Sequence, residues 1–108
     1  MKITLSPVFL AMFALCLGNG GCHKPGPHSV TLTWNAPTPM KGVTVKSYNV
    51  YRSTTSGGPF LKIASHVPGP PFQDRLVTSG RTYFYVVTAL DQTDHESRFS
   101  SEITAAIP

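Results

Sequence analysis

The side chains best suited to chemistry gather in one short polar segment, residues 91–97 (DQTDHES). It contains three acids and a histidine, Asp91, Asp94, Glu96 and His95, and carboxylates and imidazoles are common metal ligands. The spacing does not fit a calcium loop, which needs alternating acids followed by glycine. The pattern therefore favours a solvated turn in which Asp94 or His95 adopts a positive φ. A small metal-binding protein or hydrolase that uses this segment is the alternative.

Other residues that could do chemistry lack the spacing that such sites require. His23, His28 and His66 are scattered and give no zinc pattern. Asp74 paired with an acid of the polar segment could cleave a glycosidic bond, but no motif supports that pair. The Gly-x-Ser-x-Gly motif of hydrolases is absent, and the SGGP sequence at residues 56–59 lacks the Lys-Ser/Thr and helix of a phosphate loop. We therefore expect a protein that is not an enzyme and uses no cofactor or metal.

The elements that must position these residues are short strands separated by Gly and Pro turns. Residues 29–35 (SVTLTWN) alternate between apolar and polar side chains, which is the period of a half-buried strand. No 3.6-residue pattern follows residue 22, so no helix is expected to connect parallel strands. The pattern predicts an all-β fold, an antiparallel β-sandwich. Further strands are expected at residues 45–53, 60–64, 72–77, 82–90 and 99–107.

The strand at residues 82–90 is apolar on both faces. Alternation puts Phe84, Val86 and Leu90 on the side opposite the core, and Tyr51 from a neighbouring strand could lie beside them. These four residues are a candidate partner-binding face. The alternative, which we favour, is that side chains of neighbouring strands cover them. The residues expected to face the core are Tyr83, Tyr85, Val87 and Ala89.

Residues 1–21 have the layout of a secretory signal peptide. Lys2 supplies a positive start, residues 3–17 contain no charge, and small residues follow. A membrane-spanning helix would need about 20 predominantly apolar residues, and this run is shorter. We expect cleavage, which would leave residues 22–28 as a short tether and residues 29–108 as one domain.

Cys22 comes directly after Gly20 and Gly21, an arrangement that resembles the lipobox of bacterial lipoproteins. There the cysteine is acylated and becomes the mature N-terminus. Asn19 departs from the pattern, since a leucine is usual three residues before the cysteine. Ordinary cleavage near the two glycines is therefore the alternative. The lipobox interpretation predicts an extracytoplasmic, membrane-anchored protein, and the alternative predicts a secreted one.

The charged residues argue against one class of partner. The formal net charge is +4, and the Lys and Arg residues are spread along the chain rather than clustered. The sequence has no aromatic-basic recognition motif, no zinc-finger spacing and no basic arm. We therefore expect no nucleic-acid partner.

Residues 29–107 resemble a fibronectin type III domain. The matching features are the strand sequences SVTLTW and YNVYR and the spacing of Val77, Gly80 and Tyr83. The sequences TSGGPF and YFYVVTALD and a Glu-Ser-x-x-Ser ending are similar to the bacterial form of this module. The residues of that ending are Glu96, Ser97 and Ser100.

The resemblance implies an immunoglobulin-like sandwich with three structural residues. Tyr83 is expected to return its hydroxyl to the backbone of residues 77–80, a corner that Gly80 would suit, although Tyr83 as a plain core aromatic is the alternative. Trp34 is expected in the core. Strand A of the family is expected to be absent or truncated, which would leave residues 29–35 at a sheet edge.

These expectations lead to a non-catalytic binding or spacer module of the bacterial cell envelope. Lipid on Cys22 would hold it at the membrane, and its partner would be another envelope protein or a polysaccharide. The integrin-binding tripeptide of some animal members is absent from residues 91–97. That activity is therefore not implied.

Overall fold

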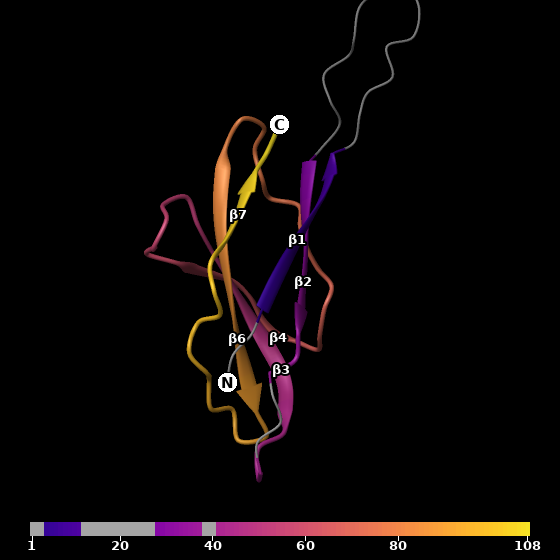
Figure 1. Cartoon of the computed structure of the whole chain (residues 1–108), viewed down its shortest axis with the longest axis vertical. Helices are drawn as coiled ribbons and strands as arrows, with labels where there is room; N and C mark the ends of the chain where they lie inside the picture. The colour runs from indigo at the N-terminus through magenta and orange to yellow at the C-terminus, as the bar shows by residue number, and fades with distance from the viewer. Residues whose placement is uncertain (1–3, 12–27, 38–40) are drawn as a thin grey trace, which may run out of the picture.

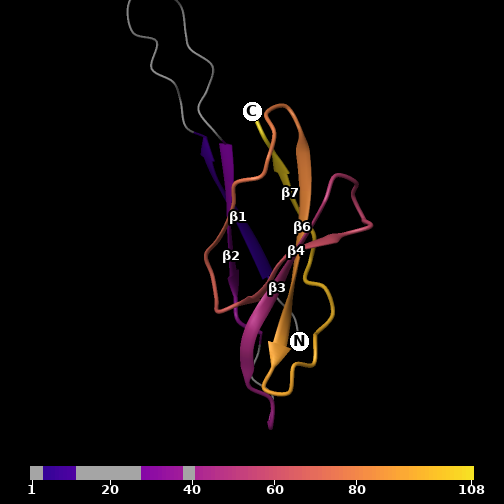
Figure 2. The same cartoon turned by 180° about the vertical axis from the view of Figure 1, so that it is seen from behind.

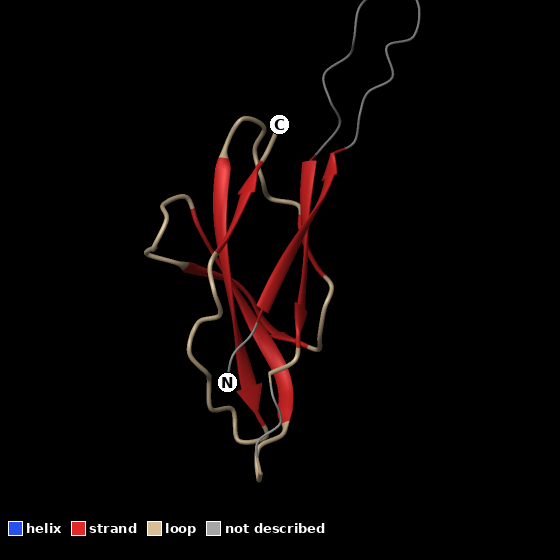
Figure 3. Cartoon of the chain, viewed as in Figure 1, coloured by secondary structure: helices blue, strands red, loops and turns tan. Residues whose placement is uncertain are grey.

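The computed structural model describes residues 4–11, 28–37 and 41–108. Within these residues the regular secondary structure consists of strands (Figure 3). The predicted all-β antiparallel sandwich is confirmed. One sheet has the order β1-β2-β5 and the other β4-β3-β6-β7, with every neighbouring pair antiparallel. The strands are β1 (Thr4–Ala11), β2 (His28–Asn35), β3 (Val45–Ser53), β4 (Leu61–Val67), β5 (Phe72–Asp74), β6 (Thr82–Asp91) and β7 (Ile103–Ala106).

The hydrophobic core lies between the two sheets, which face each other in Figure 1. From β2, Val30, Leu32 and Trp34 point inward and are at most 5% exposed. Trp34 packs edge-on against Tyr48 of β3, with ring centroids 5.2 Å apart. The alternation of apolar and polar residues in the sequence therefore predicts the inward residues of β2 and β6 correctly. The inward residues of β6 are Tyr83, Tyr85, Val87 and Ala89.

β1 is a strand that the sequence does not predict. From the sequence, strand A is expected to be absent or truncated and residues 1–21 to be a signal peptide. In the structure Thr4–Ala11 pairs along the whole of β2, from Thr4 opposite Asn35 to Ala11 opposite His28. Figure 2 shows the two strands side by side. The physical reason is that β2 would otherwise present unpaired amide and carbonyl groups, which an extended segment can satisfy. In this 108-residue chain, β1 rather than β2 is the edge of the sheet.

The predicted cleavage site and Cys22 lie outside the described residues, as do residues 23–27 of the expected tether. β2 begins at His28, one residue before the expected start of the domain. Within the part of the chain that the structure describes, no helix is long and apolar enough to cross a membrane.

The corner before β6 has the geometry expected of it. The backbone amide of Thr78 donates a hydrogen bond to the Tyr83 hydroxyl at 2.9 Å, and the Tyr83 side chain is 5% exposed. Gly80 has a φ of 79°, a left-handed conformation that glycine adopts at little cost. The amide of Arg81 closes the turn on the carbonyl of Thr78 at 3.2 Å. Tyr83 thus joins the core to the loop that precedes its own strand.

β5 and β7 are shorter than the sequence predicts because side chains replace their ladder hydrogen bonds. β5 ends at Asp74, whose Oδ1 accepts the amide of Leu76 at 3.0 Å, so the chain turns instead of continuing to residue 77. β7 begins at Ile103 instead of residue 99. The chain before it is attached to β6 through two serines, which are described below.

Candidate functional site

The outer face of the four-stranded sheet, turned away from the core, carries the four residues of the candidate partner-binding face. Tyr51 of β3 lies directly opposite Val86 of β6. Val86 and Leu90 are buried, at 2% and 5% exposed, whereas Tyr51 and Phe84 are half-buried. The four residues share a face, but they do not form a continuous exposed patch. The low exposure of Val86 and Leu90 therefore agrees with the alternative that neighbouring side chains cover them.

Tyr51 on this face and two rings next to it, Phe60 and Phe99, form what we call the aromatic cluster. The Phe99 ring packs edge-on against Tyr51 and against Phe60, with centroid distances of 5.0 and 5.6 Å. Phe99 is 53% exposed, and the other two are half-buried. The Nζ of Lys62 lies 5.8 Å from the centre of the Tyr51 ring, within reach of a cation–π contact. The aromatic cluster thus presents ring surface to solvent beside a positive charge.

Phe60 and Phe99 are candidates that sequence reasoning misses. The sequence places both in strands, but β4 begins at Leu61 and β7 at Ile103, so both rings lie on irregular backbone. The available signal was the Glu-Ser-x-x-Ser ending, which sets Phe99 next to Ser100. Its residues hold this part of the chain against the sheet.

Ser97 and Ser100 attach the segment before β7 to the edge of β6. The Ser97 hydroxyl accepts the Ala89 amide at 2.8 Å, while the Ser97 amide donates to the Ala89 carbonyl at 2.8 Å. Ser100 repeats this arrangement on Val87, again with both distances at 2.8 Å. Each serine thereby satisfies both backbone groups of one β6 residue, as a paired strand would. Phe99 is held between these two attachment points.

Glu96, the first residue of that ending, binds the outer face through a single carboxylate oxygen. Its Oε2 accepts hydrogen bonds from the Thr88 hydroxyl at 2.6 Å, from the Asn49 amide at 3.0 Å and from the Tyr51 hydroxyl. Asn49 and Thr88 are nearly fully buried, at 2% and 1% exposed. Their polar groups would cost free energy if left without partners, so Glu96 satisfies them.

The electrostatics of this contact favour a charged Glu96 and a neutral Tyr51. Burial opposes the charge, but hydrogen bonds from Thr88, Tyr51 and Asn49 together with nearby Lys62 hold the pKa of Glu96 below its ordinary value. Burial and the adjacent carboxylate raise the pKa of Tyr51. The Tyr51 hydroxyl therefore keeps its proton and donates a hydrogen bond to the Glu96 carboxylate near neutral pH, which fixes its ring in the aromatic cluster.

The other two acids of residues 91–97, Asp91 and Asp94, bind backbone amides of the turn and Lys46. Asp91 Oδ1 accepts the amides of Thr93 and His95 at 2.8 and 3.0 Å. Asp94 has a φ of 65°, which confirms the positive φ predicted for this turn, and its Oδ1 lies 2.6 Å from the Nζ of Lys46. Among the described residues, no group of three His, Cys, Asp or Glu side chains could hold a metal ion. The metal-binding alternative therefore lacks geometric support in that part of the chain.

A second polar group joins the two sheets. Asp74 of β5 is 4% exposed, and its Oδ2 accepts hydrogen bonds from Arg52 Nη1 of β3 at 2.8 Å and from the Tyr85 hydroxyl of β6 at 2.7 Å. Burial and the Asp74 carboxylate raise the pKa of Tyr85 far above its ordinary value. Burial works against the Arg52 charge, but Asp74 raises the pKa of Arg52. The Asp74 carboxylate is thus bonded to both Arg52 and Tyr85, and this contact has the character of a structural ion pair between the sheets.

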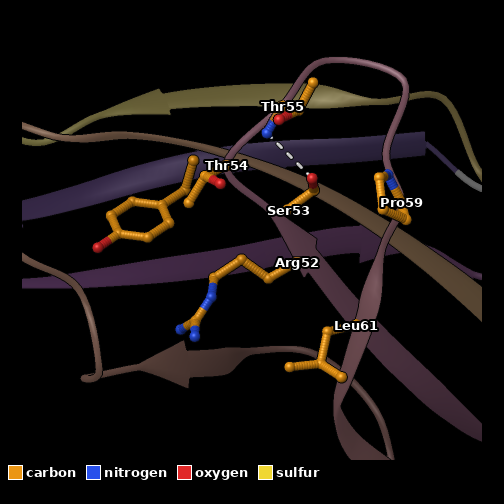
Figure 4. A pocket seen from close by; sticks show the side chains of 7 residues that line it. Arg52, Ser53, Thr54, Thr55, Pro59 and Leu61 are labelled. Carbon is orange, nitrogen blue, oxygen red and sulfur yellow. Dashed lines mark hydrogen bonds between the residues drawn. The ribbon is translucent and has the colours of Figure 1, made fainter.

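An open pocket of about 280 Å³ lies between Arg52 and the loop that connects β3 to β4. Figure 4 shows Arg52 and Leu61 on one side and Thr55 and Pro59 on the other. The loop is held by Glu102, which accepts the Gly57 amide at 2.6 Å. Because Asp74 neutralises Arg52, the pocket offers hydroxyl groups and apolar surface rather than an unpaired charge.

Relatives of known sequence are segments of much larger enzymes. The chain is 39% identical over 80 residues to an amylopullulanase from Thermoanaerobacterium saccharolyticum, and 49% identical over 59 residues to one from Thermoanaerobacter thermohydrosulfuricus. These alignments cover 74% and 55% of this chain but 6% and 4% of the enzymes. The chain thus spans a small fraction of the relatives it matches. No family model matches the sequence.

Solved structures match over nearly the whole chain. An Fn3-like protein from Clostridium thermocellum has a TM-score of 0.66 and 32% identity, with 94% of each chain covered. A pectate lyase from Erwinia chrysanthemi, solved with tetragalacturonic acid, has a TM-score of 0.66 and 21% identity, and 97% of this chain matches 28% of that one. At that identity the second likeness shows the fold alone.

Proposed function

Because the chain belongs to the fibronectin type III family, we propose that it is a non-catalytic accessory module that binds polysaccharide outside the cytoplasm. The family alone does not fix a function, since one fold hosts many. The single observation that carries the proposal is the aromatic cluster, with the Phe99 ring 53% exposed and fixed from both sides. The segments that it resembles belong to amylopullulanases, enzymes named for pullulan, a polysaccharide.

The chemistry of the cluster suits a sugar. Sugar rings have faces made of C–H groups, which pack on aromatic rings, and hydroxyls at their rim, which bind polar side chains. Phe99 offers the exposed ring, and Lys62 supplies a donor next to Tyr51. The rings need little reordering on binding, because Tyr51 is fixed by Glu96 and Phe99 by the flanking serines.

The proposed absence of catalysis rests on how the acids are used. Glu96 is bound by three donors, Asp91 by backbone amides and Asp74 by Arg52 and Tyr85. Each of these carboxylates thus stabilises the fold around it through the hydrogen bonds that it accepts.

The location that we propose is the cell envelope. Residues 1–21 are removed as a signal peptide, Cys22 is acylated, and residues 22–28 tether the domain of residues 29–108 to the membrane. The support is the uncharged run followed by Gly-Gly-Cys. A secreted form is the outcome if Cys22 carries no lipid.

The experiment is to incubate the protein with soluble polysaccharides, pullulan among them, and to measure both binding and the release of new reducing ends. Binding without release, unchanged by a metal chelator, is the expected result. Release that stops when the chelator is added would instead support a metal-dependent hydrolase at residues 91–97. Crosslinking to a protein in intact cells, with no polysaccharide bound, would replace the proposed ligand by an envelope protein.

A further inference from the structure

We propose that the mature chain pairs with a second copy of itself along the edge of β2. The inference rests on the removal of residues 1–21 that the proposed function includes. β1 (Thr4–Ala11) lies within the removed segment, so maturation would uncover the whole length of β2. The two copies would then form one continuous sheet, β5-β2-β2-β5.

β1 shows what this edge can accept. It forms an unbroken antiparallel ladder of eight residues with β2, without a register shift. A regular ladder of this length is a template for any strand that can approach it. Residues 22–27 cannot replace β1, because they lead directly into β2 and are too few to turn back along its eight residues.

β2 lacks the devices that protect the other edges of the described sheets. His28–Asn35 contains no Lys, Arg, Asp, Glu or Pro. β5 has three residues and β7 has four, too few for a stable intermolecular ladder. β4 carries Lys62, has His66 at a φ of 55°, and pairs with two register shifts. Short length, Lys and bulges are the common ways to block edge pairing, and β2 uses none of them.

The faces of β2 restrict how two copies can pair. Opposite residues in an antiparallel pair lie on the same face, so the inward residues of one copy, His28, Val30, Leu32 and Trp34, must meet inward residues of the other, and the outward Thr31 and Thr33 must meet outward residues. Among the symmetric registers, one centred on Thr31 places Thr31 opposite itself and Val30 opposite Leu32, and one centred on Leu32 places Thr31 opposite Thr33 and Val30 opposite Trp34. In both, the core of one copy continues into the core of the other.

A second copy is the occupant that these features favour. The same strand serves both sides of a two-fold interface, and no like charges face each other across it. Anchoring in one membrane would also raise the local concentration of copies, which strengthens a weak contact.

The experiment uses two differently tagged copies of the 108-residue precursor, produced together and extracted from membranes. One tag is captured, the second is quantified, and the intact mass reports whether residues 1–21 have been removed. One variant combines Thr31→Lys with Thr33→Lys, and another combines Thr31→Glu with Thr33→Glu. The control combines Thr82→Lys with Ser101→Lys, which adds the same charge at exposed positions outside β2.

Processed wild-type copies are expected to co-purify, as is the control. Two copies of the lysine variant should co-purify about tenfold less, because like charges then face each other, and a lysine copy with a glutamate copy should recover the wild-type level. Processed wild-type copies that stay separate, or a lysine–glutamate pair no better than lysine–lysine, would overturn the inference alone. Copies that retain residues 1–21 would overturn both the proposed maturation and the inference. Capture of a different polypeptide through β2 would overturn the second copy as occupant.

Discussion

The amide of Val87 donates a hydrogen bond to the Ser100 hydroxyl at 2.8 Å, while the Ser100 amide donates to the Val87 carbonyl at the same distance. Together with the equivalent contact of Ser97 on Ala89, this relationship gives the Glu-Ser-x-x-Ser ending of this chain a structural role. It attaches an irregular segment to a strand edge and holds Phe99 in place.

Ser100→Ala should destabilise the domain by about 1 to 3 kcal/mol, because the buried Val87 amide loses its acceptor. The measurement is chemical denaturation. Ser101→Ala is the matched control, since Ser101 is exposed, and it should change the free energy of unfolding by less than about 0.5 kcal/mol. Equal effects of the two substitutions would contradict the role given to Ser100.

Tyr83→Phe should cost about 0.5 to 1.5 kcal/mol without unfolding the domain, because the Thr78 amide loses the hydroxyl that accepts it. Thermal unfolding measures the change. Tyr48→Phe serves as the control, because that residue is equally buried and the hydrogen bond that holds the corner is made by Tyr83. If both variants unfold at the wild-type temperature, the corner does not stabilise the fold.

Glu96→Gln should remove part of the acid sensitivity of the domain. The pKa of Glu96 is lowered in the folded state, so its stabilisation is complete above its ordinary pKa and is lost as pH falls through the lowered value. At neutral pH the substitution should cost about 1 kcal/mol, a modest value because solvent screens this exposed side chain.

Unfolding measured from pH 7 to pH 3 checks this expectation. Wild-type stability should fall across the acid range, and Glu96→Gln should fall less steeply. Asp91 and Asp94 also have lowered pKa values, so some acid sensitivity should remain. Parallel curves for the two proteins would show that Glu96 contributes nothing to the pH dependence.

Cys22→Ser should abolish lipid attachment, because the acylated thiol is replaced by a hydroxyl. Metabolic labelling with a fatty acid followed by intact mass measurement detects the modification. Cys16→Ser should keep the label, since Cys16 lies inside the uncharged run that is removed. An unlabelled wild-type chain with a free Cys22 thiol would point to the secreted form.

The sequence predicts the sandwich and its core because one face of each strand must be apolar. This rule applies directly to alternate residues of β2 and β6. They are Val30, Leu32 and Trp34 on β2, and Tyr83, Tyr85, Val87 and Ala89 on β6. The corner at Gly80 was also predictable, since the Val77, Gly80 and Tyr83 spacing reflects local geometry.

The aromatic cluster was not predictable in the same way. The local sequence predicts that Phe99 lies in a strand. In the structure Ser97 and Ser100 instead bind the backbone of β6 with their side chains, and this tertiary effect leaves Phe99 on irregular backbone. Glu96 meets Asn49 across 47 positions of the chain, and no local pattern reports such a contact. β1 was missed because the same apolar residues suit both a signal peptide and a strand.

Affinity electrophoresis in native gels cast with and without pullulan or another soluble polysaccharide tests the central claim, that the aromatic cluster binds polysaccharide. Wild-type protein should migrate more slowly in at least one polysaccharide gel, and Phe99→Ser should lose most of that retardation. Leu76→Ser is the matched control: Leu76 is 80% exposed and follows β5 of the three-stranded sheet, whereas Tyr51 is on the four-stranded sheet, so the Leu76 variant should be retarded like the wild type. Equal migration of the wild-type protein with and without every polysaccharide, or equal retardation of wild type and Phe99→Ser, would contradict the claim.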